Sequence, residues 1–441
     1  MQATKARYKF LSNTGGFMPS RLLSLLVLSL ATSGLLAQST PQIQEPEPSV
    51  QSLLERIQRL EKRIGELEDH QRTQAADGAG TPGSAAVDGG NTQSSTVPEQ
   101  PPEHQHAPNT TAVREAERHY PSLQIRGFGD VDFSATDQKG SVSGFNLGQF
   151  VLHFASPLSE KVSYFGELSF TAQPAAYEVQ VERSIIRYDY NDYFKISFGK
   201  YHTPISYWNT AFHHGAWLQT TVSRPEMVRF GGTFIPIHFV GLQAEGNIPS
   251  GGLGLGYNVG LGNGRSSILS KAGDNGDSND NRAWVASVFA RPARLYGLQF
   301  GGAVYRDKLT PELGRNFDEL ITSAHLVWTK EHPEFLSEFA NVHHRDVLTS
   351  NTYNSQAFYI QLAYRLPWQE NKWKPYYRFE YIHKPESDPV FLNVSDLVGS
   401  TVGVRYDITN YAAFKGEYRN SRIGRDEPRV NGGFFQTAFT F

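Results

Sequence analysis

The sequence contains no cysteine, so disulfide bonds, thiolate metal sites and cysteine nucleophiles are excluded. A strong net charge is also absent: the formal value is −3 over 441 residues, which gives no electrostatic reason to expect nucleic acid as a partner. The mean hydropathy of −0.44 excludes a helical membrane protein. It permits a membrane barrel, because apolar and polar side chains alternate along barrel strands and their hydropathies average out.

Catalytic and metal-binding motifs are lacking as well. The sequence has no Gly-x-Ser-x-Gly elbow, no His-Glu-x-x-His and no phosphate-cradling glycine loop, so we expect neither an enzyme nor a cofactor. Two histidine pairs, His213-His214 and His343-His344, invite a metal interpretation. Adjacent residues of a strand point to opposite faces, so neither pair can chelate through both rings if it is extended. We therefore predict no metal site.

The N-terminus has the pattern of an export signal. Arg21 precedes the short apolar stretch 22–30, and small residues follow up to Ala37. A basic region, a short apolar core and a small residue before the cleavage point predict a signal peptide over residues 1–37. Met18 would be a more usual start, which makes residues 1–17 an upstream extension. Export of a cysteine-free chain suits a Gram-negative envelope.

A heptad pattern and a polar stretch follow the predicted signal. Apolar residues at a and d positions predict a short coiled-coil helix over residues 45–70, with a single amphipathic helix docked on a barrel rim as the alternative. The a and d positions are Val50, Leu53, Ile57, Leu60, Ile64 and Leu67. Residues 71–119 are rich in Gly, Pro, Ser, Thr, Gln and Ala and have too few apolar residues for a core, so we predict a flexible linker.

Residues 120–441 alternate between apolar and polar side chains in segments of about ten residues that are separated by turns. In one segment Phe358, Ile360, Leu362 and Tyr364 share a face, and Tyr359, Gln361, Ala363 and Arg365 share the other. Aromatic residues near strand ends, such as Tyr376 and Tyr377, are typical of interfacial girdles. The pattern predicts an all-β fold: a transmembrane antiparallel β-barrel of about sixteen strands, with eighteen as the alternative.

The last segment supports closure of this barrel. Phe435, Thr437, Phe439 and Phe441 lie on one face at period two, and a final strand that pairs with the first lets the chain stop there. Phe439 and the terminal Phe441 also resemble the recognition signal of outer-membrane barrels. We therefore predict outer-membrane lipid and the barrel assembly machinery as partners.

One connection, after about the fifth strand, is too aromatic for a flexible surface loop and too irregular for a strand. We predict that residues 202–225 fold inward and form a constriction, because irregular backbone at membrane depth must line a water-filled cavity or be buried in protein. A loop over the barrel mouth or on a neighbouring subunit is the alternative. The residues predicted to carry this site are His202, Tyr207, Trp208, His213, His214, Trp217 and Arg224.

Charged side chains of inward parity should line the pore, where rings of charge filter ions. Local cross-strand ion pairs without a filtering role are the alternative for each of them. The predicted pore-lining bases are Arg183, Arg187, Lys195, Arg365, Arg378 and Arg405, and the acids are Glu167, Asp189, Glu380 and Asp407. Because bases and acids both line the pore, we predict at most a modest preference for ions of one sign.

The order of signal, coiled coil, linker and barrel, together with residues 198–204 (Phe-Gly-Lys-Tyr-His-Thr-Pro), resembles the phosphate-selective porin O and P family and its coiled-coil-bearing relatives. The resemblance implies a homotrimeric, water-filled channel of the Gram-negative outer membrane for passive diffusion of small hydrophilic, anionic solutes. Phosphate selectivity does not carry over, because residues 201–226 contain no dense cluster of bases. The alternative function is a structural or adhesive barrel that the coiled coil tethers to the periplasm.

Overall fold

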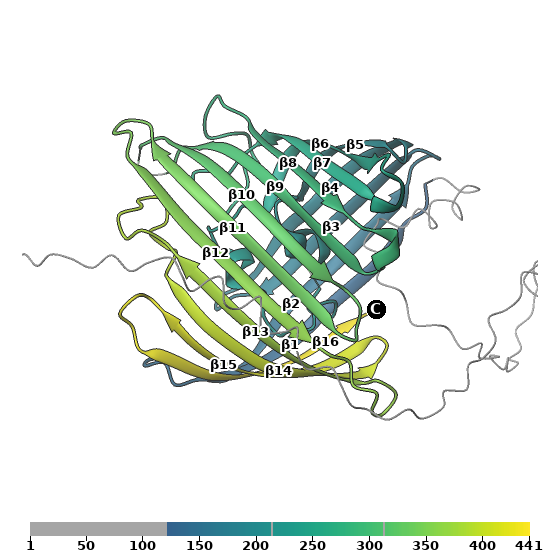
Figure 1. Cartoon of the computed structure of the whole chain (residues 1–441), viewed down its shortest axis with the longest axis vertical. Coiled ribbons are helices and arrows are strands. Elements are labelled where there is room, and N and C mark those ends of the chain that lie inside the picture. The colour runs from purple at the N-terminus through teal and green to yellow at the C-terminus, as the bar shows by residue number, and fades with distance from the viewer. Residues whose placement is uncertain (1–120, 213–214, 312–313) are drawn as a thin grey trace, which may run out of the picture. The chain divides into compact units, whose positions relative to one another are not determined.

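The computed structural model describes residues 121–441 except 213–214 and 312–313, so the predicted signal peptide, coiled coil and linker lie outside the described residues. Sixteen strands form a closed antiparallel barrel (Figure 1). The strands are β1 Gln124–Thr136, β2 Gly144–Pro157, β3 Val162–Ala172, β4 Tyr177–Asn191, β5 Phe194–His202, β6 His238–Ile248, β7 Leu255–Asn263, β8 Ala283–Ala290, β9 Leu298–Leu309, β10 Phe317–Trp328, β11 Glu334–Asp346, β12 Thr352–Ala363, β13 Trp373–His383, β14 Leu397–Thr409, β15 Ala412–Ile423 and β16 Arg429–Thr440. The predicted fold class is confirmed, and the number of strands is sixteen rather than eighteen.

Side chains alternate between the two faces of the wall. On β12, Ile360 and Leu362 are 39% and 46% exposed, whereas Tyr359 and Gln361, which alternate with them, are fully buried. Exposed large apolar side chains recur at this parity around the ring, which places the apolar face outside and the polar face inside. The outer surface is therefore suited to lipid and the inner surface to water or to packed polar groups.

The first and last strands close the ring. β1 pairs with β16 from Phe128 opposite Thr440 to Thr136 opposite Gly432. Beyond this ladder, Gly127 and Phe441 exchange two backbone hydrogen bonds of 2.9 and 3.0 Å. The C-terminal residue is thus held by the sheet, and no free sheet edge remains.

Short and long connections lie at opposite ends of the strands. The turn between β4 and β5 is short because the Asn191 side-chain oxygen accepts hydrogen bonds from the backbone N–H groups of Tyr193 and Phe194, each at 2.9 Å. The longest connections are residues 203–237, 264–282 and 384–396, and all three lie at the other end. Within the described part of the chain, no helix combines the length and apolar character needed to cross a membrane.

Candidate functional site

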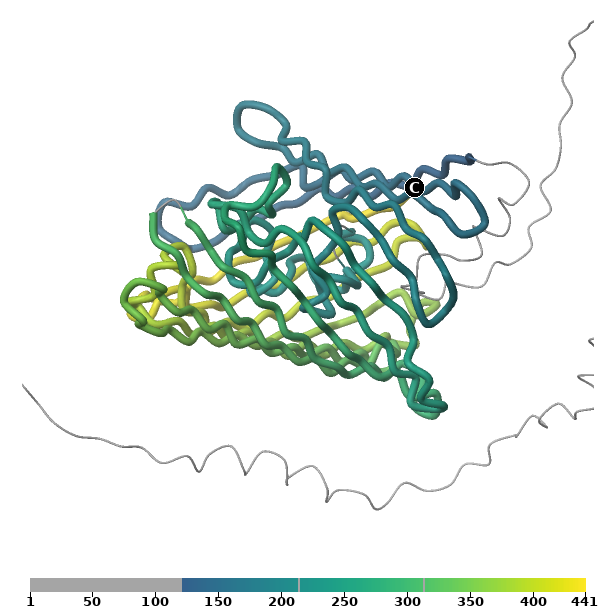
Figure 2. The backbone as a smooth tube through the Cα atoms, turned by 90° about the horizontal axis from the view of Figure 1, so that it is seen from above, coloured from purple at the N-terminus to yellow at the C-terminus, as the bar shows by residue number. Residues whose placement is uncertain are grey.

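Residues 203–237, which we call the inward segment, join β5 to β6 and lie inside the ring of strands (Figure 2). Their backbone is hydrogen-bonded to inward-facing side chains of β10, β11, β13, β14 and β15. In ring order, β13 and β14 lie opposite β5 and β6. The inward segment therefore crosses the barrel interior.

The inward segment begins with the short helix α3 (Tyr207–Ala211), which is fixed by a carboxylate of the barrel wall. Glu338 of β11 accepts hydrogen bonds from the backbone N–H of Tyr207 at 2.6 Å and of Trp208 at 2.8 Å. It also accepts one from the Tyr359 hydroxyl at 2.7 Å. The first N–H groups of a helix have no partner within the helix, so an ionised carboxylate at this position satisfies them and fixes the helix against β11.

Three basic side chains of β13–β15 hold residues 216–223 of the inward segment, which we call the far limb. Arg378 donates to the Ser223 carbonyl at 2.8 Å, and Arg405 donates to the carbonyls of Trp217 and Gln219. Lys415 donates to the carbonyls of Ala216 and Thr221. Backbone carbonyls that would otherwise lose hydrogen bonds with water are thus satisfied by wall cations.

Residues 224–237 of the inward segment lead back to β6, and we call them the return limb. They carry the charged side chains Arg224, Glu226 and Arg229. The Arg224 guanidinium lies over the Phe230 ring at 3.9 Å, and burial lowers its pKa to about 9. The backbone N–H of Glu226 donates to Glu380 at 2.7 Å, and burial raises the pKa of the Glu226 carboxyl. Glu226 pairs with Arg229 at 2.6 Å, and both side chains are about half exposed, so this pair meets water.

Long connections at the same end pack on the return limb. Arg265 of the β7–β8 connection lies 3.2 Å from Glu319 of β10 and donates to the Phe234 carbonyl. Glu319 lies 3.0 Å from the His344 ring, whose other nitrogen lies 2.8 Å from Asp388 of the β13–β14 connection. All four side chains of this chain of contacts are buried, so the segment is fixed from this side too.

Most of the predicted pore-lining charges are engaged in local ion pairs. Arg183 pairs with Glu167 at 2.5 Å, Arg187 with Asp189 at 2.7 Å, and Arg365 with Glu331 at 2.8 Å. Arg378 pairs with Glu380 at 3.1 Å and Arg405 with Asp407 at 2.7 Å, but both arginines are buried against the inward segment and do not face open space. Lys195 lines a cavity described below.

The predicted residues of the 202–225 connection have separate surroundings. His202 is the buried last residue of β5, and its ring lies 3.5 Å from Glu167. Tyr207 and Trp208 are buried in α3, and Arg405 lies 5.8 Å from the centre of the Trp217 ring. His213 and His214 lie outside the described residues. In the part of the chain that the structure describes, no group of three or more His, Asp or Glu side chains is arranged to hold a metal ion.

The interior is unevenly filled. Inward-facing side chains of β10–β13, such as Ile321, Glu338 and Tyr359, are fully buried under the inward segment. Four polar ones of β1 and β2, namely Asp130, Asp132, Gln149 and His153, are only half-buried. Water therefore reaches the inner wall beside β1 and β2.

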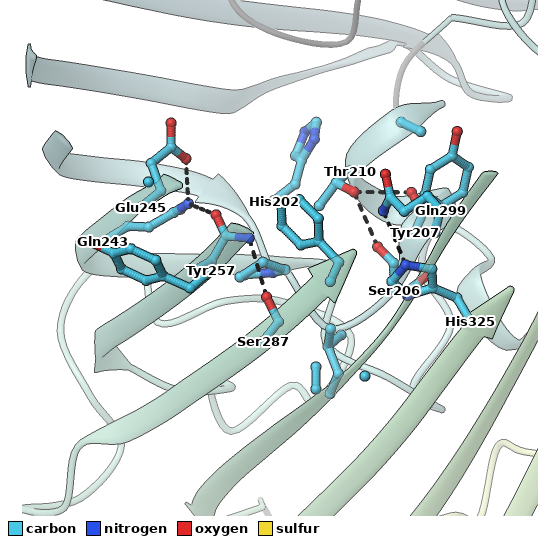
Figure 3. A pocket seen from close by; sticks show the side chains of 18 of the residues that line it. His202, Ser206, Tyr207, Thr210, Gln243, Glu245, Tyr257, Ser287, Gln299 and His325 are labelled. Atoms are coloured by element: carbon cyan, nitrogen blue, oxygen red, sulfur yellow. Dashed lines mark hydrogen bonds between the residues drawn. The ribbon is translucent and has the colours of Figure 1, made fainter. Parts of the chain in front are cut away.

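A cavity of about 330 Å³ lies between α3 and the walls formed by β5–β10 (Figure 3). Two hydrogen-bonded rows of side chains line it. One runs from Glu245 through Gln243 and Asn258 to Ser287, with separations of 3.0, 3.2 and 3.2 Å. The other joins Arg291, Gln299 and His325 at 2.7 and 3.0 Å. The cavity thus has polar walls toward the ends of the strands that carry the short turns.

Several side chains that hold the inward segment were missed by sequence reasoning, although Arg378, Arg405 and Glu380 were predicted to face inward. The missed side chains include Glu338, Glu334, Lys415 and Glu417. Parity could have placed Lys415 and Glu417 inside, because Phe414 and Tyr418 alternate with them. No local signal says that an inward charge will meet a backbone more than a hundred residues away in the sequence.

No family model matches the chain, and no curated protein matches it. Solved structures do resemble it over 73% of its length. An anion-selective porin from Comamonas acidovorans matches with a TM-score of 0.54, 10% identity and 100% of that chain covered. The outer-membrane channel DcaP of Acinetobacter baumannii gives 0.50, 13% and 97%, and OmpF of Salmonella typhi gives 0.50, 11% and 98%.

These likenesses are of fold. The chain has the sixteen-stranded barrel of outer-membrane porins, with the apolar outer surface of a barrel that spans a membrane.

Proposed function

We propose that this chain is a porin of the Gram-negative outer membrane, through which small hydrophilic solutes diffuse passively. The observation that carries the proposal is the inward segment. This connection crosses the interior and narrows the lumen. Glu338, Arg378, Arg405 and Lys415 hold it in place, so its position does not depend on a bound solute. A rigid, polar constriction sorts solutes by size and charge.

The solute path runs beside β1 and β2, between the wall and the inward segment. Half-buried Asp130, Asp132, Gln149 and His153 support this path, because inward-facing side chains of β10–β13 such as Ile321 and Tyr359 are fully buried under the inward segment. The half-exposed Glu226–Arg229 pair of the return limb supplies the charged groups of the constriction.

A modest preference for anions is the proposed selectivity. In the pairs Arg183–Glu167 and Arg419–Glu417, the base is about a quarter exposed and the acid is fully buried, so the cation meets passing solutes. Asp130 and Asp132 place acidic side chains on the inner face of β1, so the proposed preference is small. The phosphate specificity of the family that the sequence resembles is not proposed.

The assembly proposed is a homotrimer that the barrel assembly machinery inserts. Closed cyclic symmetry is usual for homo-oligomers, and exposed apolar side chains recur on the outer faces of β1–β4.

The direct test is ion selectivity of the folded oligomer in a planar bilayer under a salt gradient. We expect stepwise conductance and a reversal potential that indicates a small preference for chloride over potassium. A cation preference would contradict the proposed selectivity alone. A folded oligomer that never conducts would contradict the porin function itself.

A further inference from the structure

The outer face of β11 and β12 changes from apolar to polar toward the end with the long connections. On β11 the outward side chains change from Phe335 and Phe339 to Asn341, His343 and Arg345. On β12 the series Leu362, Ile360 and Phe358 gives way to Gln356, Asn354 and Thr352. The outer face of β4 is different, since Tyr177, Val179 and Val181 at the same end are 60%, 56% and 50% exposed. The polar region of β11 and β12 is therefore not a feature of the whole outer wall at this end.

Three bases lie together in this polar region. Arg306 and Lys308 are on β9 and Arg345 is on β11, all at positions whose neighbours in the strand point inward and are buried. Lys308 and Arg345 both stand opposite Asp318 of β10 in the register. Arg306 stands opposite Leu320, which is opposite His343. We call Arg306, Lys308 and Arg345 the outer basic cluster.

The outer basic cluster is not neutralised by the barrel itself. None of its three side chains makes an ion pair or hydrogen bond with the described residues, although most inward-facing bases do. Asp318 is the one acid among the cross-strand neighbours, so the cluster has a surplus of positive charge. Strands are about 4.8 Å apart, so the backbones of Lys308 and Arg345 are roughly 10 Å apart, a span that two long side chains can bridge around one anion.

In membrane barrels the long connections are extracellular and the short turns are periplasmic, so this end of the outer face lies at the outer leaflet. We infer that the outer basic cluster binds phosphate groups on the headgroups of outer-leaflet lipid. The cluster faces outward from the wall, directly above the apolar surface that contacts acyl chains, so its ligand must be a lipid headgroup and not a solute in the lumen. Arginine and lysine pair strongly with phosphate oxygens, and neighbouring asparagine, glutamine and threonine side chains suit the hydroxyl groups of a sugar headgroup. This inference rests on the proposed outer-membrane location and is independent of conduction.

The test measures binding of diphosphoryl lipid A to the folded protein in detergent, with the Arg306→Gln/Lys308→Gln/Arg345→Gln variant beside the wild type. We expect the triple variant to bind at least tenfold more weakly. Wild-type affinity should fall with added salt, and lipid A stripped of its phosphates should bind as weakly as the variant does. Millimolar inorganic phosphate should not displace bound lipid A, which separates a lipid headgroup from free phosphate.

A matched control removes the same charge from the other end of the barrel. Lys161, Lys330 and Lys372 lie in the short turns, so Lys161→Gln/Lys330→Gln/Lys372→Gln should leave lipid A binding within twofold of the wild type. Equal binding by the wild type and the first variant, or equal loss in both variants, would overturn the inference.

If the triple variant does not fold, Arg306→Gln and Arg345→Gln are tested singly, each with an expected loss of about threefold. Unchanged affinity in both single variants would then contradict the inference. Bilayer conductance of the same samples shows separately whether the proposed channel function holds.

Discussion

At the scale of single residues, Glu338 connects the barrel wall to the inward segment. Its side chain is buried and accepts three hydrogen bonds, two from the backbone of α3 and one from Tyr359. A buried carboxylate is stable when its oxygens are well satisfied, and the donors here belong to a segment that has to hold one position. Glu338 therefore fixes α3 against β11, and Asn209 of α3 adds hydrogen bonds to the carbonyls of Thr203 and Ile237.

Replacing Glu338 should loosen the inward segment. Glu338→Ala leaves the N–H groups of Tyr207 and Trp208 unpaired inside the barrel, at a cost of about 3 kcal/mol in the free energy of unfolding. Urea unfolding in lipid vesicles measures this cost, and single-channel recordings should show higher and noisier conductance. Gln356→Ala, on the outer face of β12, is the control and should change neither quantity. Quiet, unchanged conductance in the Glu338 variant would show that α3 is held by other contacts.

At the scale of elements, the short turn between β10 and β11 contains a second anchoring carboxylate. Glu331 lies 3.0 Å from Lys374 of β13 and 2.8 Å from Arg365, which follows β12. Burial alone would raise the pKa of Glu331, but Lys374 and Arg365 outweigh it and hold the pKa at about 2. The turn thus ties together the ends of three strands.

This shift predicts a pH-dependent contribution to stability. A carboxylate with a lowered pKa in the folded state stabilises the fold above its unfolded pKa of about 4.5, and the contribution is lost as the pH falls toward about 2. Glu331→Gln should therefore lower the melting temperature at pH 7. The difference from wild type should shrink between pH 4.5 and pH 2, as followed by circular dichroism. A difference that stays constant across this range would rule out the ion pairs as its cause.

The sequence predicted the faces of individual strands well, but it did not predict the contacts between distant elements. Period-two alternation was enough to predict the faces of β12 and β16, because lipid and water impose opposite demands on the two sides of a wall. It failed at Tyr376, which was predicted as a girdle residue beside Tyr377. Adjacent residues cannot both face lipid, and Tyr376 points inward and donates to Glu417 at 2.8 Å. The contacts of the inward segment could not be predicted, since they join residues that only closure of the ring brings together.

At the scale of the whole molecule, Phe441 extends the seam between β1 and β16 that closes the ring. Phe441 exchanges two backbone hydrogen bonds with Gly127, and its ring stacks on Phe150 of β2 with centres 5.9 Å apart. Deleting Phe441 removes this end of the seam between β1 and β16. We expect the shortened chain to fold more slowly into vesicles, as measured by the heat-dependent shift in gel mobility. The molecules that do fold should conduct normally. Folding at the wild-type rate would show that the terminal residue has no part in assembly.

Whether the inward segment constricts the pore is tested most directly by the conductance of a chain without that segment. Residues 207–232 are replaced by a short Gly-Ser linker, and folded wild type and variant are compared in the same planar bilayer and salt. We predict that the wild type conducts and that the variant conducts severalfold more, with its ion preference reduced. Equal conductance and selectivity in the two proteins would contradict the claim that the inward segment constricts the pore.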